Sequence, residues 1–137
     1  MEYLVKRSAI TSEKSACAIL PIFANKRLSE DTKGVDKLYK GLIATAVKNG
    51  DISGNAGETL LIPTPAGSAH KRLLLVGCGK STQIDIIKYR KIINAVAQKL
   101  KSTGTTGAVS VLASLDVADQ TARSLARTQV MVFEDVF

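Results

Sequence analysis

The chain has little of several residue types on which small proteins often rely. Its 137 residues include no tryptophan, one histidine and two cysteines, and aromatic residues make up only 4%. We therefore expect a core built mainly of leucine, isoleucine, valine and alanine. Two cysteines do not make a disulfide framework. Because each lies in an apolar run, we interpret Cys17 and Cys78 as buried small hydrophobic residues.

The same scarcity limits the chemistry that the chain can perform. His70 lies in a stretch rich in proline, glycine, serine and lysine, so we expect an exposed loop residue and no Ser–His–Asp or Cys–His arrangement. Metal sites need clustered ligands, and the scattered acids and separated cysteines offer none. The adjacent acids at 30–31 and 134–135 are interpreted as solvated or helix-terminal charges. We predict no catalytic residue, no metal ligand and no cofactor in this chain.

Targeting and membrane signals are also missing. No apolar run approaches the roughly 18 residues of a membrane span. The segment Met1–Arg7 mixes acid and base where a signal peptide would need an unbroken apolar region. We therefore expect a cytoplasmic protein without a membrane partner.

The length corresponds to about one domain, and the apolar periodicity alternates between strands and helices. The continuous apolar run 72–77 is typical of a central strand covered on both faces, whereas Pro21 indicates a sheet edge or a bulge. The alternation predicts an α/β fold with a mixed, mostly parallel sheet flanked by helices on both faces. The expected strands are Tyr3–Arg7, Ala16–Phe23, Glu58–Pro63, Arg72–Gly77 and Ala108–Ala113, and the expected helices are Val35–Asn49, Ile84–Lys101 and Asp116–Glu134.

The positive charge is concentrated in one segment. The net charge is +7, and residues 71–101 hold eight bases against one acid, so they carry all of it. On the expected helix 84–101 these bases lie opposite or beside an apolar seam, which consists of Ile86, Tyr89, Ile93, Val96 and Leu100. They predict a face for nucleic-acid phosphates, a face for an acidic partner surface, or a merely solvated helix face. The face consists of Lys88, Arg90, Lys91, Lys99 and Lys101.

A glycine-rich segment follows the most apolar strand. A Walker motif would need glycine at Leu74, and a dinucleotide fingerprint would need glycine at Thr82, so neither is present. What remains is a Gly-x-Gly turn with Gly77, Gly79 and Lys80, expected close to a helix N-terminus. Free N–H groups there would attract an anion; the alternative is a tight turn that needs small residues.

The last eight residues, Val130–Phe137, are unusually apolar for a chain terminus. They indicate either a chain that continues into a further domain or a final helix that docks on its own sheet.

Two successive segments resemble a known family. The succession GNAGETLLIP at 54–63, followed by KRLLLVGCGK at 71–80, resembles the N-terminal domain of the leucyl aminopeptidases, also called cytosol aminopeptidases or peptidase family M17. Cys78 stands where that family usually has leucine, and the tail 124–137 resembles the helix leading to the catalytic domain. The resemblance covers nearly all of this chain but only the first part of a family member.

The resemblance implies a macro-domain-like fold, and a cytoplasmic, hexameric exopeptidase that releases N-terminal residues, preferably leucine. Two divalent metals, zinc or manganese, would lie in a C-terminal domain whose NTDAEGRL-type ligand stretch is not found here. Residues 1–137 would then form a single non-catalytic domain, and only the longer protein would be an enzyme. Its partners would be the catalytic domain and neighbouring subunits. The alternatives are a DNA-binding module using the 71–101 face, or an ADP-ribose or nucleotide binder at the Gly77–Lys80 loop.

Overall fold

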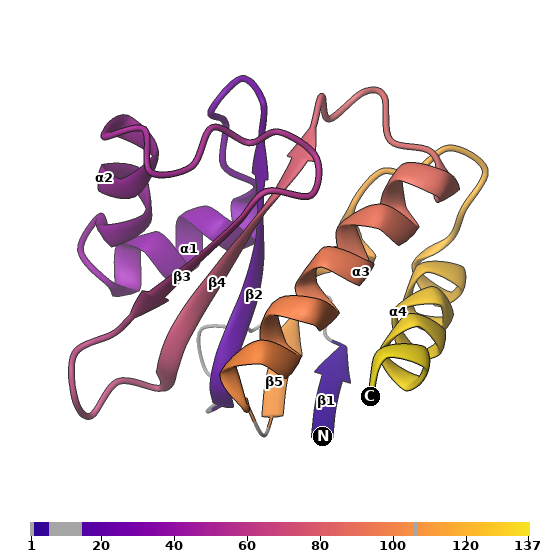
Figure 1. Ribbon diagram of the computed structural model, residues 1–137. Helices are drawn as coiled ribbons and strands as arrows, with labels where there is room; N and C mark the ends of the chain where they lie inside the picture. Colours follow the sequence, from indigo (N-terminus) through magenta and orange to yellow (C-terminus); the bar gives the residue numbers. More distant parts are fainter. Residues whose placement is uncertain (1, 6–14, 106) are drawn as a thin grey trace.

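One five-stranded sheet organises the molecule (Figure 1). The computed structural model describes residues 2–5, 15–105 and 107–137. The strands follow the order β1-β5-β2-β4-β3; β3 is antiparallel to β4, and the other neighbours are parallel. The mixed, mostly parallel sheet is therefore confirmed. Its strands are β1 (Glu2–Val5), β2 (Ser15–Phe23), β3 (Thr59–Pro63), β4 (His70–Gly79) and β5 (Gly107–Ser110), and the rest of the strand expected at 3–7 lies outside the described residues.

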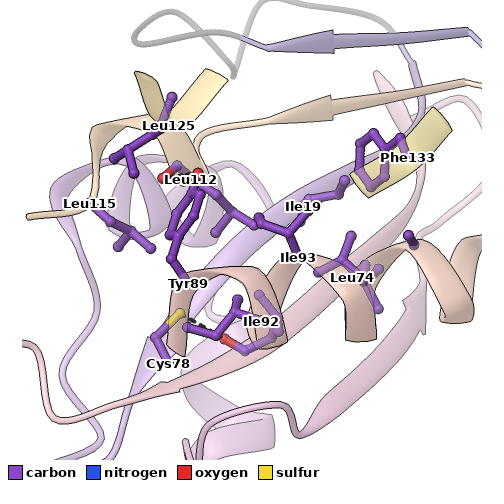
Figure 2. Close-up of a cluster of buried hydrophobic side chains, with 14 of the residues drawn as sticks. Ile19, Leu74, Cys78, Tyr89, Ile92, Ile93, Leu112, Leu115, Leu125 and Phe133 are labelled. Atoms are coloured by element: carbon purple, nitrogen blue, oxygen red, sulfur yellow. Dashed lines mark hydrogen bonds between the residues drawn. The ribbon is translucent and has the colours of Figure 1, made fainter. Parts of the chain in front are cut away.

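Helices cover both faces of this sheet (Figure 1). Successive side chains of a strand point to opposite faces, so Leu74 and Val76 enter one apolar cluster while Leu73 and Leu75 enter the other. The first cluster is shared with α3 (Ile86–Thr103) and α4 (Ala122–Val136), as Figure 2 shows. The second is shared with α1 (Glu30–Leu38) and α2 (Leu42–Lys48). Burial on both sides explains why the central strands read as continuous apolar runs.

The single helix expected at 35–49 is wrong, because the chain forms two helices there. Between them Lys40 and Gly41 adopt left-handed backbone, with φ of 56° and 84°. The carboxylate of Asp36 then accepts hydrogen bonds from the backbone N–H groups of Ile43 (2.7 Å) and Ala44 (3.1 Å). This side chain satisfies donors at the start of α2 that have no partner inside the helix.

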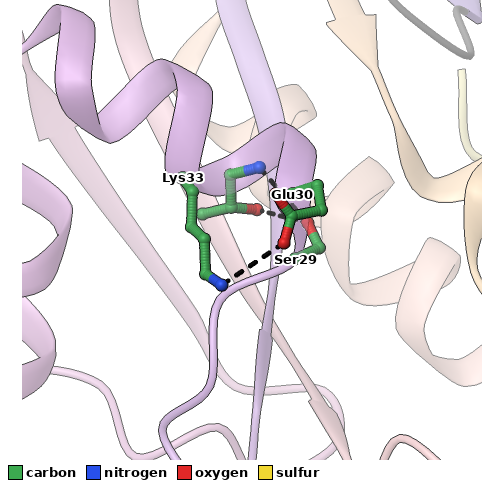
Figure 3. A network of polar contacts seen from close by, with 4 residues as sticks. Ser29, Glu30 and Lys33 are labelled. Atoms are coloured by element: carbon green, nitrogen blue, oxygen red, sulfur yellow. Dashed lines mark hydrogen bonds and ion pairs between the residues drawn. The ribbon is translucent and has the colours of Figure 1, made fainter.

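α1 begins at Glu30, earlier than the helix start expected at Val35 (Figure 3). Ser29 caps it by accepting from the Thr32 N–H at 3.2 Å. Glu30 lies in the first turn, where its charge suits the helix dipole, and pairs with Lys33 at 3.3 Å. Both side chains of this pair are exposed, so it contributes little to stability.

Pro21 lies in the interior of the sheet, which corrects the expected edge position. β2 pairs with β4 on one side and with β5 on the other, but the β5 pairing ends at Ile19. Pro21 therefore meets no strand that would need its missing N–H, and its carbonyl accepts from the Thr32 hydroxyl at 3.3 Å. The proline also indicated a bulge as the alternative. β2 does have a register shift close by, between Ile22 and Phe23.

The remaining elements differ from expectation mainly at their ends. α3 begins at Ile86 because Asp85 caps it, accepting from the Lys88 N–H at 2.8 Å, and it ends at the left-handed Gly104. β5 is shorter than expected and leads into a 3-10 turn, Leu112–Ser114. α4 begins only at Ala122, where Thr121 and Ser124 form a reciprocal capping box.

Candidate functional site at the carboxyl edge of the sheet

The two glycine-containing segments singled out in the sequence contact each other at the carboxyl ends of β2 and β4. The loop 53–58 lies against the end of β4 through three backbone hydrogen bonds. Gly57 N–H donates to the Gly77 carbonyl (3.0 Å), Gly77 N–H to the Glu58 carbonyl (2.6 Å), and Gly79 N–H to the Gly54 carbonyl (2.8 Å). The end of β2 joins this contact, since Ala24 N–H donates to the Gly79 carbonyl at 2.9 Å.

Glycine is required here because the backbones approach too closely for any side chain. A Cβ on Gly77 would lie 1.9 Å from the carbonyl oxygen of Asn55, and one on Gly54 would lie 2.2 Å from that of Phe23. Gly54 also has a φ of +94°, which L side chains rarely adopt. Gly77 is therefore required by the contact between the two segments, and Gly54 by its close approach to the end of β2.

Glu58 holds the loop closed. One of its carboxylate oxygens accepts from the Ser53 N–H, the Ser53 hydroxyl and the Gly54 N–H, each at 2.9 Å. Partial burial by itself raises the pKa of this carboxyl, but the hydrogen bonds from Ser53, Gly54 and Asn55 outweigh it and leave the pKa below its ordinary value. Sequence reasoning placed Glu58 in the family pattern and at the start of an expected strand, and it assigned no role to the side chain.

We expect Glu58→Gln to destabilise the chain by about 1 kcal/mol at neutral pH, because a neutral amide oxygen accepts these hydrogen bonds less strongly than a carboxylate. The folded pKa of Glu58 is lowered. Its contribution is therefore complete above the unfolded pKa and is lost as the pH falls through the folded one. Urea unfolding between about pH 7 and pH 3 should show the difference between wild type and variant shrinking at acid pH. Glu134→Gln, at an exposed position, is the control, and a difference independent of pH would contradict the role of the charge.

The Gly-x-Gly segment is not a turn at a helix N-terminus, which corrects the sequence interpretation. β4 continues through Gly79, and α3 begins only at Ile86 with Asp85 as its cap. The N–H groups of Gly77 and Gly79 already donate to backbone carbonyls. The prediction of anion binding at Gly77, Gly79 and Lys80 assumed free backbone N–H groups. At both glycines these groups are already hydrogen-bonded. Anion binding by this segment stays a prediction, now without that argument.

The basic residues of α3 do not form one continuous stripe. At 3.6 residues per turn, the half-buried Lys88 and Lys99 lie at one margin of the exposed face, and the exposed Arg90 and Lys101 at the other. The exposed Lys91 lies nearer the first pair. Uncharged residues separate the two margins, namely Ile87, Asn94 and Gln98.

Several of these cations are also used inside the domain. Lys101 Nζ donates to the Val136 carbonyl at 3.1 Å, which ties α3 to the end of α4. The Lys91 side chain lies over Gly57, and the Lys88 ammonium lies beside Gly79. Binding of DNA or of an acidic partner by this face remains a prediction, and the arrangement adds no support to it.

His70 is fully buried, so the expected exposed loop residue is wrong. β4 begins two residues earlier than expected and includes it. The Tyr39 hydroxyl lies 2.8 Å from His70 Nδ1 and accepts from the His70 N–H at 3.1 Å. Local sequence patterns do not indicate this contact, because the two residues are 31 positions apart.

The cysteine interpretation is confirmed. Cys17 and Cys78 are free and fully buried. Burial raises the pKa of both thiols to about 12, and Arg72 only partly offsets this at Cys17. Because the thiolate is the reactive form, neither cysteine is a candidate nucleophile at neutral pH.

Within the described residues, no three histidine, cysteine or acidic side chains come together as metal ligands. The zinc or manganese implied by the family resemblance therefore finds no fitting donor set in this part of the chain. No helix in the same part is both long and apolar enough to cross a bilayer.

Comparison with protein families gives one match across most of the chain. Residues 19–134 match the model of the cytosol aminopeptidase family, N-terminal domain. The chain is 37% identical over 132 residues to a probable cytosol aminopeptidase of Stutzerimonas stutzeri, covering 96% of this chain and 26% of that protein. It is 35% identical over 121 residues to one of Actinobacillus pleuropneumoniae, covering 88% and 24%. The chain thus spans about a quarter of the length of these relatives.

Solved structures show the same fold at low sequence identity. A tomato leucine aminopeptidase mutant superposes with a TM-score of 0.71 and 19% identity, covering 99% of this chain and 28% of that one. The macrodomain of Mycobacterium tuberculosis DarG gives a TM-score of 0.74 with 8% identity, covering 98% and 91%. The likeness to a whole macrodomain confirms the macro-domain-like fold.

Proposed function

Because the chain belongs to the cytosol aminopeptidase family and corresponds to its N-terminal domain, we propose that it is the non-catalytic domain of a cytoplasmic leucyl aminopeptidase. The observation that carries this proposal is the family match over residues 19–134, together with relatives that are about four times as long. The two divalent metals, zinc or manganese, and the peptide-cleaving residues would then belong to a separate C-terminal domain. Its substrates would be peptides with a free N-terminus.

The role of this domain would be to support assembly. It would pack on its own catalytic domain and on neighbouring subunits of a hexamer. Two features suit that role: the described core is covered by helices on both faces, and the loop 53–58 is joined to the sheet by backbone hydrogen bonds. A domain of this kind positions others without contributing a reacting group.

The purified chain is expected to release no p-nitroaniline from leucine p-nitroanilide, with or without added manganese or zinc. The physical reason is that the described residues hold no metal-ligand cluster and no accessible thiol. An established leucyl aminopeptidase assayed in parallel is the positive control. Turnover above the blank that co-purifies with the chain would contradict the proposal.

Assembly is tested separately, on the full product of the gene that encodes this chain. Sedimentation velocity should give a larger oligomer for that product than for a version lacking residues 1–137. Equal oligomeric states for both would contradict a role in assembly while leaving the non-catalytic assignment intact.

A further inference from the structure

A cavity lies far from the carboxyl edge, at the opposite end of β4. It has a volume of about 460 Å³, within the range of small-molecule pockets. One wall is the end of α1 and the turn after it, Leu38–Lys40. The other wall is the connection between β3 and β4, where Pro65, Gly67, Ser68 and Ala69 line it. Nothing in the proposed function uses this cavity.

Both walls are held in place by hydrogen bonds, so the cavity is formed before any ligand arrives. Tyr39 is anchored by its contacts with the buried His70. The β3–β4 connection is closed by Ser68, whose hydroxyl and N–H both donate to the Pro65 carbonyl, at 2.6 and 3.2 Å. At its base, the Thr64 hydroxyl donates to the carbonyl of His70, and the Thr64 N–H donates to the carbonyl of Lys71 at 3.2 Å. A preformed site spares a ligand the cost of ordering the protein.

The surface of the cavity is apolar with one charge. Leu38 is a large apolar side chain that is 48% exposed, and Tyr39, Pro65 and Ala69 continue this apolar surface. The single ionisable amine among the described lining residues is Lys40, and no acid is among them. The acid closest in sequence, Asp36, is engaged in capping α2.

Lys40 holds this position on strained backbone. Its φ of 56° is left-handed, a conformation that costs a residue with a Cβ free energy and that glycine adopts freely. This conformation ends α1, because the N–H groups of Lys40 and Gly41 then donate to the carbonyls of Lys37 and Asp36, at 3.3 and 2.9 Å. Lys40 is therefore an exposed lysine that lines the cavity at a position where glycine would be unstrained.

We propose that this cavity binds a small monocarboxylate with an apolar body, its carboxylate on Lys40 and its apolar part against Leu38, Tyr39 and Pro65. The single positive charge selects the acid, and the apolar walls select a branched or aromatic body. This binding site is independent of the proposed aminopeptidase function.

The probe is 4-phenylbutyrate, titrated into isotope-labelled chain while backbone amide shifts are recorded by NMR. Shifts are expected at residues 38–40 and 67–69. The neutral 4-phenylbutanol should bind about 3- to 5-fold more weakly, since a partly exposed ion pair contributes an effect of this size. Butyrate, which lacks the ring, should not produce these shifts at the same concentration.

Lys40→Gly removes the ammonium group while relieving the strained backbone, so folding is preserved. It should weaken phenylbutyrate about 3- to 5-fold and leave phenylbutanol unchanged. Lys37→Gln, at an exposed position on α1 outside the cavity, is the matched control and should change neither. The proposal is overturned if the shifts fall outside the two walls or are absent, if acid and alcohol bind equally, or if Lys40→Gly binds the acid as the wild type does.

Discussion

Gly77→Ala is expected to destabilise the chain by about 3 kcal/mol or more. The new Cβ would lie 1.9 Å from the Asn55 oxygen and 2.8 Å from two further backbone carbon atoms. Backbone atoms cannot rotate away as a side chain can. The loop 53–58 would have to leave β4, which breaks the hydrogen bonds at Gly77. Urea unfolding monitored by circular dichroism measures the loss.

Gly104→Ala is the matched control for this experiment. Gly104 has a φ of +66° but nothing within 4 Å of an added Cβ, so the substitution adds conformational strain without a collision. It should cost about 1 kcal/mol. Equal losses for the two variants would show that the contact between the two glycine segments is not what requires Gly77.

Tyr89→Phe is expected to cost about 2 kcal/mol, because it leaves a buried amide without its partner. The Tyr89 hydroxyl donates to the Leu112 carbonyl at 3.0 Å and accepts from Gln129 Nε2 at 3.0 Å, inside the cluster of Figure 2. Burial raises the pKa of this hydroxyl above its ordinary value, partly offset by Gln129, so it stays protonated as a donor. Gln129 Oε1 already has no partner among the described residues, which makes this side chain sensitive to a second loss.

A double-mutant cycle separates the hydrogen bond from the lost volume. Tyr89→Phe combined with Gln129→Leu removes both polar groups, and it should cost less than the sum of the two single substitutions by about 1 to 2 kcal/mol. Gln98→Leu, at an exposed position on α3, controls for the removal of an amide and should change stability little. Additive losses would contradict coupling between Tyr89 and Gln129.

The class of fold could be predicted from the sequence because it depends on local patterns. The run Leu73–Val76 is apolar at every position, and the structure shows alternate side chains entering the two clusters. The apolar seam of α3 likewise predicted which residues are buried, among them Ile93, Val96 and Leu100. Periods of two and 3.6 residues express the geometry of strands and helices themselves, so they can be read without knowing what packs against them.

The sequence could not give the partners of particular groups, because these lie far apart along the chain. Gly77 meets Asn55 across 22 positions, and His70 meets Tyr39 across 31. The first contact engages the N–H groups that a turn at a helix N-terminus would have left free, and the second buries a histidine that its neighbours in sequence place in a loop. Amino-acid periodicity thus determined the α/β fold of this chain. Only the tertiary structure decided which polar groups remain available for binding, because a hydrogen bond depends on distances that the local sequence does not fix.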